Sequence, residues 1–201
     1  MNWLNIITYS GTFVFALTGA LKARTHKMDV FGAAVLAFCT AYGGGTIRDI
    51  LLGIQPVNWL GDYIALALVI SALGIIFLFK TNIDKFNRII FITDAIGLGM
   101  FTIAGIQVSM HIGVGSLYSV IMGVITATFG GLVTDILCNN IPDLLKSGEL
   151  YATACFVGGL IFILLLKLGI SPDICMLTCV MLIVSLRILS KMKKLHLPRF
   201  K

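Results

Sequence analysis

Charged side chains are scarce in this sequence, and their scarcity excludes most soluble folds. Asp, Glu, Lys and Arg together make up 12% of the 201 residues, whereas 58% of the residues are hydrophobic. A soluble domain carries roughly 25% charged residues to cover its surface. The surface of this chain must therefore face something other than water, and apolar runs of about 18–20 residues, long enough to cross a bilayer as a helix, recur along it. We predict an all-α integral membrane protein without a large soluble domain.

Patterns that would indicate an enzyme or a metal centre are also missing. The sequence has no GxSxG, HExxH, Walker or CxxCH pattern, and the glycines at positions 43–45 follow no predicted strand. The cysteines are odd in number and form no CxxC pair or Cys/His cluster, so we interpret them as small packing residues, with a metal or redox site as the weaker alternative. They are Cys39, Cys138, Cys155, Cys175 and Cys179. The sequence predicts neither an enzyme nor a bound cofactor or metal.

Seven apolar stretches have the length of membrane spans. Charged loops at residues 22–29 and 80–88 separate some of them, and Pro56 and Pro142 are expected to stop the second and fifth helices. Ser171 and Pro172 are typical of a turn followed by the start of a helix. Basic residues follow the first stretch rather than precede it, so we interpret it as a retained helix and not as a signal peptide. The predicted spans cover residues 3–21, 29–53, 62–80, 88–108, 114–138, 149–168 and 171–190.

The basic residues predict the orientation in the membrane. Seven spans place the two ends of the chain on opposite sides. With the basic C-terminal tail in the cytoplasm, only Arg48 and Lys167 of the 15 Lys and Arg residues fall near the outer side. Cytoplasmic loops of membrane proteins are rich in Lys and Arg. We therefore expect the N-terminus outside and the C-terminus in the cytoplasm, and we attribute the net charge of +6 to this sorting rather than to nucleic-acid binding.

An internal repeat is the most informative feature of the chain. When the sequence is aligned with itself without gaps at an offset of about 86 residues, apolar, glycine, aspartate and proline residues fall at the same positions. Each repeat unit holds three predicted spans, an odd number, so the second copy must enter the membrane upside down. We predict two inverted three-helix repeats, at residues 1–86 and 87–170, followed by a seventh helix and basic tail at 171–201. The matched pairs include Gly11 with Gly97, Phe15 with Phe101, Gly19 with Gly105, Gly44 with Gly130, Gly45 with Gly131, Asp49 with Asp135 and Pro56 with Pro142.

Consecutive glycines lie in the second and fifth predicted spans. Glycine costs about 1 kcal/mol relative to alanine inside a helix, so Gly43, Gly44 and Gly45 should weaken the second span, and Gly130 and Gly131 the fifth. A break there would free backbone carbonyls, which must be buried or line water and would be good cation ligands. We therefore predict a kink beside a transport pathway at these glycines. The alternative is that they serve only close helix packing.

Ionisable residues accompany these glycines. Arg48 and Asp49 follow the first run within one turn, and Asp135 repeats Asp49 in the other copy. Ionisable groups inside a span are costly and usually mark a pathway or a paired site, so we predict that they are pore charges or gates, with a structural ion pair as the alternative. The copies differ, because Thr134 stands in place of Arg48 and Phe129 in place of Gly43. Asp94, near one end of the fourth span, is a further candidate, unless it only snorkels or caps that helix.

At these residues the chain resembles the trimeric intracellular cation channel family, in its bacterial branch. The resemblance is carried by GGGTIRDILLG at residues 43–53, FGGLVTDIL at residues 129–137 and the layout of two three-helix units plus one helix. It implies a homotrimer in the bacterial inner membrane, in contact with membrane lipids that include a possible bound lipid. Each subunit would hold a pore lined by glycine-kinked second and fifth helices, through which potassium, sodium and other monovalent cations permeate.

Two other functions are compatible with the same residues. The bacterial family is also catalogued as a glycine transporter, and inverted repeats with broken helices suit a secondary transporter equally well. In that case Arg48, with Asp49 or Asp135, would bind the carboxylate and the amine of a zwitterion. A membrane scaffold without transport activity is the third alternative. The sequence favours a passive potassium channel.

Overall fold

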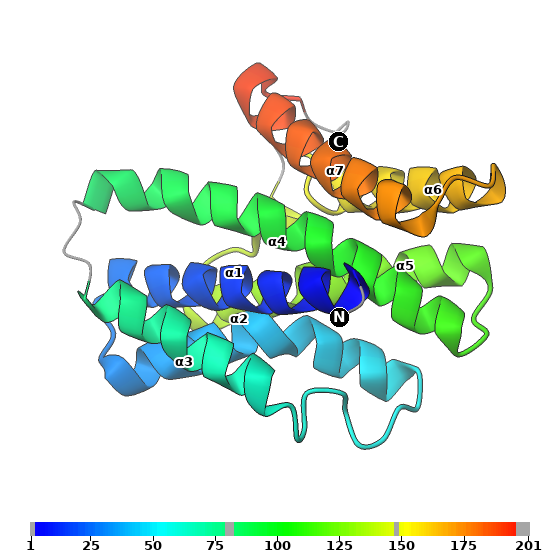
Figure 1. Ribbon diagram of the computed structural model, residues 1–201. Coiled ribbons are helices and arrows are strands. Elements are labelled where there is room, and N and C mark those ends of the chain that lie inside the picture. The colour runs from blue at the N-terminus through cyan, green and yellow to red at the C-terminus, as the bar shows by residue number, and fades with distance from the viewer. Residues whose placement is uncertain (1–2, 79–82, 147–148, 196–201) are drawn as a thin grey trace.

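The computed structural model describes residues 3–78, 83–146 and 149–195, and of residues 83–86 it describes the backbone alone. In these ranges the chain forms seven α-helices and one short 3-10 helix, with no strand (Figure 1). The predicted all-α fold with seven helices is confirmed. The elements are α1 (Trp3–Thr25), α2 (Val30–Leu51), α3 (Tyr63–Leu78), α4 (Ile83–His111), α5 (Ser116–Leu137), η1 (Asp143–Leu145), α6 (Ala152–Lys167) and α7 (Pro172–Lys193).

Five of the described helices are long and apolar enough to cross a membrane: α1, α2, α4, α5 and α7. The other two, α3 and α6, are apolar but have 16 residues each. A helix of that length extends about 24 Å, somewhat less than the roughly 30 Å of a bilayer core. The short helix is the third one in each repeat, so the two copies share this property as well.

Five predicted helix ends need correction, two of them because α4 extends to His111 rather than residue 108 and α7 to Lys193 rather than residue 190. Helix α4 begins at Ile83 and not at residue 88, so most of the predicted charged loop at 80–88 is helical, and residues 79–82 lie outside the described ones. Its 29 residues extend about 43 Å, which is longer than the roughly 30 Å of a bilayer core. Helix α1 continues to Thr25 rather than ending at residue 21, and its last turn includes Lys22 and Arg24. Helix α6 begins at Ala152 rather than at residue 149.

The end of α2 has a different cause from the predicted one. The helix stops before Gly53, whose φ of 68° is left-handed, and the Ile54 N–H donates to the Asp49 carbonyl at 2.8 Å. This turn terminates a helix by its own hydrogen bonds. Pro56 comes too late to cause the stop. Helix α5 ends in the same turn, with Asn139 (φ 54°) in place of Gly53 and not at Pro142. By contrast, the predicted start of α7, with Ser171 before the helix and Pro172 in its first turn, is confirmed.

The contact between α1 and α4 shows how the two copies are related. Gly11 packs against Phe101, and Gly97 packs against Phe15. Residue numbers in these contacts rise along α1, from 11 to 15, while those of the partners on α4 fall, from 101 to 97. The two helices are therefore antiparallel. Each of the two pairs is the repeat equivalent of the other. An antiparallel contact between equivalent helices is what two inverted copies produce, and the centroids of the Phe15 and Phe101 rings are 5.0 Å apart in it.

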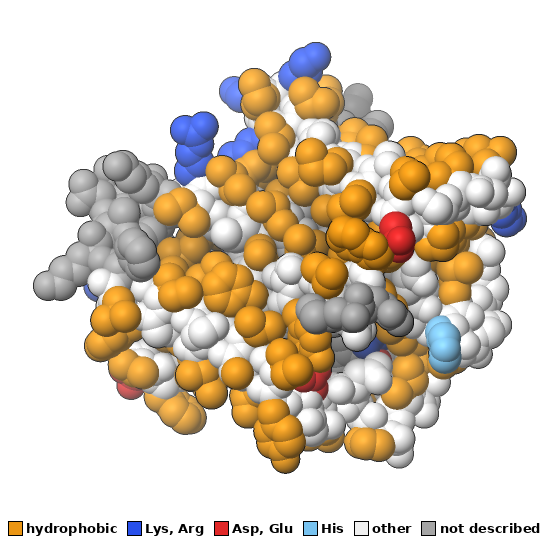
Figure 2. Space-filling model, viewed as in Figure 1, with side chains coloured by type: hydrophobic (Ala, Val, Ile, Leu, Met, Phe, Trp, Pro, Cys, Tyr) orange, Lys and Arg blue, Asp and Glu red, His pale blue; other side chains and the backbone are white. Residues whose placement is uncertain are grey.

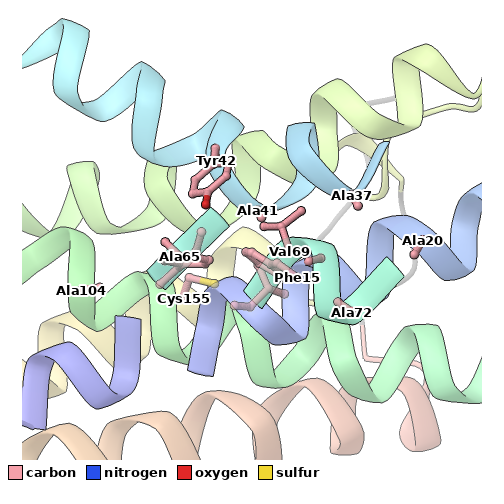
Figure 3. Packing of buried hydrophobic residues seen from close by; sticks show 14 of the residues in the cluster. Phe15, Ala20, Ala37, Ala41, Tyr42, Ala65, Val69, Ala72, Ala104 and Cys155 are labelled. Atoms are coloured by element: carbon pink, nitrogen blue, oxygen red, sulfur yellow. The ribbon is translucent and has the colours of Figure 1, made fainter. Parts of the chain in front are cut away.

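Small residues allow the helices to approach closely. Alanines from α1, α2, α3 and α4 and one cysteine from α6 belong to the same buried cluster as Phe15, part of which Figure 3 shows. Within each copy a glycine of the first helix faces the second helix: Gly19 lies against Ala37 and Thr40, and Gly105 lies against Gly123 and Thr126. On the outside, hydrophobic side chains cover much of the face in Figure 2, and most Lys and Arg in that view lie toward its margins. Such a surface suits a lipid environment.

Candidate functional site: the crossing of α2 and α5

The predicted glycine runs meet where α2 crosses α5. A Cβ atom on Gly44 would overlap the Thr126 carbonyl oxygen of α5, and a Cβ atom on Gly130 would overlap the Thr40 carbonyl oxygen of α2. These two contacts are repeat equivalents of each other. The helix backbones therefore touch at this point, and any side chain larger than hydrogen at Gly44 or Gly130 would separate them.

The predicted break in these helices is not present. Both α2 and α5 run as unbroken α-helices through their glycines, so no backbone carbonyl is freed there. The helical hydrogen bonds persist because the close contact between the helices offsets the low helix propensity of glycine. A bend within a continuous helix stays a prediction.

The remaining residues of the glycine motifs have looser surroundings. A Cβ atom on Gly43 would lie 3.4 Å from the Gly130 Cα atom, and one on Gly45 would meet only the Arg48 guanidinium, at 3.7 Å. On the other copy, a Cβ atom on Gly131 would lie 2.9 Å from the Tyr151 hydroxyl. Phe129 is half-buried. Gly44 and Gly130 are therefore required for close helix packing. Gly45 has no neighbour close enough to require a glycine.

Two threonines join α2 to α5 beside this contact. The Thr40 and Thr134 hydroxyl oxygens lie 2.7 Å apart and share a hydrogen bond, and both residues are buried. Thr134 also donates to the Gly130 carbonyl of its own helix. The residue that replaces Arg48 in the second copy thus links the two helices through a neutral hydrogen bond.

Arg48 and Asp49 form a closed pair at the end of α2. The Arg48 Nε and Nη2 atoms donate to the Asp49 Oδ1 atom at 2.9 and 2.7 Å, and both residues are buried. The Asn58 backbone N–H donates to Asp49 Oδ2 at 2.8 Å, and the Asn58 side-chain amide donates to Oδ1 at 3.1 Å. The carboxylate therefore holds the loop after α2 in place while its charge is neutralised. Trp59 of this loop stacks on Tyr42, with ring centroids 5.3 Å apart.

Asp135 holds the loop after α5 in the same way but pairs with a different cation. The Asp143 backbone N–H donates to Asp135 Oδ2 at 2.9 Å, as Asn58 does in the first copy. The cation is Lys22 of α1, whose Nζ atom lies 2.6 Å from Asp135 Oδ1. Sequence reasoning missed Lys22, because it interpreted the lysine only as a marker of orientation. The available signal was a lysine in the last turn of an apolar helix, close to the loops of the same side.

Asp94 is buried and does not snorkel or cap its helix. The Tyr151 hydroxyl donates to Asp94 Oδ1 at 3.2 Å, and Arg187 Nη2 of α7 lies 3.5 Å from Oδ2. The Arg187 side chain is also buried, donates to Glu149 at 3.1 Å and lies over the rings of Tyr151 and Phe91. Arg187 is the second partner that the sequence analysis missed, again because it was interpreted as a marker of orientation.

A polar cavity of about 350 Å³ opens beside this group. Its wall carries acidic and basic side chains in equal number, which is unusual among so many apolar helices. No set of three Cys, His, Asp or Glu residues within the described ranges is arranged to hold a metal ion. The cavity is lined by Asn87, Ile90, Phe91, Asp94, Asp143, Lys146, Glu149, Arg187 and Lys191.

Comparisons with known proteins agree with this arrangement. The chain matches the family model described as glycine transporter over residues 5–80 and 91–167. The UPF0126 inner membrane protein YadS of Escherichia coli is 41% identical over 162 residues, which cover 79% of this chain and 75% of that protein. A solved structure that concerns conductance through TRIC cation channels is 34% identical, covers 100% of this chain and 98% of the other, and has a TM-score of 0.86.

A second solved structure supports the same assignment. The TRIC trimeric intracellular cation channel orthologue from Rhodobacter sphaeroides is 30% identical, covers 97% of this chain and 100% of the other, and also has a TM-score of 0.86. These relatives are membrane proteins and channels and not enzymes. By sequence and by fold, the chain belongs to the TRIC cation channel family, and it matches the glycine-transporter family model over most of its length.

Proposed function

We propose that the chain is a passive channel for monovalent cations, with potassium as the main permeant ion and a pathway between α2 and α5 of each subunit. The observation that carries the proposal is the likeness to TRIC cation channels along the whole chain. The site adds a physical reason. Asp49 and Asp135 stand near opposite ends of the α2–α5 crossing, roughly 20 Å apart along helices that rise 1.5 Å per residue. Each carboxylate is paired with a cation of the chain, Asp49 with Arg48 and Asp135 with Lys22, so in our proposal it attracts a permeant cation once that pair opens.

The contact between α2 and α5 favours a non-conducting arrangement. Backbone atoms of the two helices meet at Gly44 and Gly130, and Thr40 shares a hydrogen bond with Thr134. An ion with even part of its water shell does not fit between touching backbones. In our proposal α2 and α5 must therefore separate at the glycines before cations pass, with the weak helix propensity of glycine easing a bend.

The assembly and the orientation belong to the same proposal. We expect a homotrimer in the inner membrane, because the R. sphaeroides relative is a trimeric channel and YadS is an inner membrane protein. The pathway would lie inside each subunit, and membrane lipids would cover the outer apolar faces. The distribution of Lys and Arg supports a cytoplasmic C-terminus.

A flux measurement tests the channel proposal. Purified protein in liposomes loaded with potassium chloride should release potassium down its gradient when a counter-ion can move. The rate should rise in proportion to the gradient, without saturation and without a requirement for glycine. Liposomes that release no potassium in any lipid mixture would contradict the proposal.

Glycine transport is the second candidate, and the description of the matched family model favours it. A zwitterion needs a cation for its carboxylate and an anion for its amine. Arg48 and Asp49 are less suited to this role than their sequence implied, because each already neutralises the other and Asn58 binds the same carboxylate. Saturable uptake of labelled glycine, coupled to an ion gradient and without potassium release, would favour this candidate.

Replacement of Asp135 tests the part of the site on α5. Asp135→Asn keeps an oxygen that accepts from the Asp143 N–H but removes the charge that attracts cations and neutralises Lys22. We expect potassium flux to fall several-fold while the melting temperature changes little, because the long Lys22 stem allows its ammonium to reach water. Asp173→Asn, at the exposed start of α7, is the matched control and should leave flux unchanged. An unchanged flux for Asp135→Asn would make its role structural.

A further inference from the structure

Lys22 is placed as a cation among acidic groups. It lies in the last turn of α1 with only 11% of its side chain exposed, and its Nζ atom meets Asp135 Oδ1 at 2.6 Å. The carboxylates of Asp94 and Asp143 also attract its charge. Carboxylates from α4, α5 and the segment after α5 therefore stabilise the positive charge of its ammonium group.

This arrangement has no equivalent in the other copy of the repeat. The position that matches Lys22 is Val108, and the cation that neutralises Asp49 is Arg48 from the same helix. The Arg48 pair is closed by two hydrogen bonds between neighbouring residues. Lys22, in contrast, reaches Asp135 from another helix through one hydrogen bond, at the end of a flexible stem. The Lys22 ammonium is therefore the easier of the two cations to displace.

The polar cavity lies next to this pair, although neither Lys22 nor Asp135 lines it. Asp94 and Asp143 line it, and the Asp143 backbone N–H donates to the second oxygen of Asp135. The Asp94 Oδ2 atom is buried and accepts no hydrogen bond from the described residues, although Arg187 is 3.5 Å away. Such an oxygen has unused capacity to interact with a cation or with its water shell. The cavity therefore borders the residues around Asp135, and one buried carboxylate oxygen in its wall is not saturated with hydrogen bonds.

We propose that Asp135 is a binding site for a monovalent cation, and that the Lys22 ammonium occupies this site as a tethered cation until a permeant ion replaces it. An ammonium group and a potassium ion both carry one positive charge, so they compete for the same carboxylate. The Asp135 carboxylate is neutralised by one ammonium group, so a monovalent ion can replace that ammonium without a change in net charge. The role of the site in conduction rests on the proposed channel function, whereas the binding of a cation does not.

Thermal melting as a function of potassium tests the site without requiring conduction. Potassium chloride is exchanged for N-methyl-D-glucamine chloride at constant ionic strength. Lys22→Met removes the tethered charge and keeps the length of the side chain, so the vacant site should now bind potassium. Its melting temperature should rise by about 5 °C or more when potassium exceeds the dissociation constant about 100 times. The wild type, whose site is filled, should respond far less.

Two further variants separate this effect from a general effect of salt. Lys22→Met combined with Asp135→Asn lacks the carboxylate and should lose the response to potassium. Lys193→Met, which removes an exposed lysine of α7, should behave as the wild type does. A Lys22→Met protein whose melting temperature is the same in both salts would overturn the proposal.

A measurement on the wild type covers the case in which Lys22→Met does not fold. Potassium that competes for Asp135 should release the Lys22 amine and raise its acetylation by acetic anhydride, read by mass spectrometry of its peptide. The exposed Lys193 of α7, which does not line the cavity, serves as the internal reference. A Lys22 to Lys193 ratio that is the same in potassium and in N-methyl-D-glucamine would also overturn the proposal. If these binding tests succeed and potassium flux is absent, the site stands and the channel proposal falls.

Discussion

Gly44→Ala should lower the stability of the folded protein by about 2 kcal/mol or more, because the added methyl group forces apart two helices that are in backbone contact. A Cβ atom at this position would overlap the Thr126 carbonyl oxygen, which is part of a helix and cannot move alone. The gain of about 1 kcal/mol in helix propensity does not offset this overlap. The measurement is thermal or denaturant melting in detergent, followed by circular dichroism. Gly130→Ala, the repeat equivalent, should behave in the same way.

The neighbouring glycine provides the matched control. In Gly45→Ala the added Cβ atom would lie 3.7 Å from the Arg48 guanidinium, an ordinary contact, so the stability should stay the same or rise by up to about 1 kcal/mol. The two variants differ by one position on the same helix. If Gly44→Ala and Gly45→Ala melt at the same temperature, the backbones of α2 and α5 are not in direct contact at Gly44.

Arg187→Met should cost about 3–5 kcal/mol, because it leaves the buried Asp94 carboxylate without its nearest cation. The guanidinium of Arg187 neutralises Asp94 at 3.5 Å and Glu149 at 3.1 Å, and it is only 2% exposed. Methionine fills much of the same volume, so the loss reports on charge more than on packing. The measurement is the same melting experiment at neutral pH.

Two comparisons make this second prediction specific. Lys191→Met, one turn further along α7, removes an exposed ammonium group 3.8 Å from the centre of the Phe91 ring and should change stability little. Adding Asp94→Asn to Arg187→Met removes the unpaired charge and should recover part of the lost stability, which a double-mutant cycle measures. Equal losses for Arg187→Met and Lys191→Met would show that the buried pair does not stabilise the fold.

The repeat was the part of the fold that the sequence predicted best. Equal residues at a constant offset imply equal environments, and the contacts of Gly44 with α5 and of Gly130 with α2 have this relation. The inversion followed from the odd number of spans in each unit. Helix ends were predicted less well: Gly53 ends α2 by its left-handed backbone, whereas a search for prolines pointed to Pro56.

The partners of the charged residues could not be predicted in the same way. Asp135 pairs with Lys22, 113 positions earlier, and Asp94 pairs with Arg187 at the other end of the chain. Nothing in local spacing indicates such distant pairs, because they depend on how the helices pack. For the same reason the sequence could not decide between a helix break and close packing at the glycines: propensity favoured a break, and the contact between α2 and α5 kept both helices whole.

Single-channel recording tests the central claim most directly, namely that the inverted repeats enclose a passive pathway for cations. The purified protein is fused into a planar lipid bilayer that separates two concentrations of potassium chloride. The account predicts unitary currents that reverse close to the equilibrium potential of potassium, and smaller currents for Asp135→Asn. A bilayer that stays electrically silent, while the same preparation accumulates glycine in a saturable manner against its gradient, would contradict it.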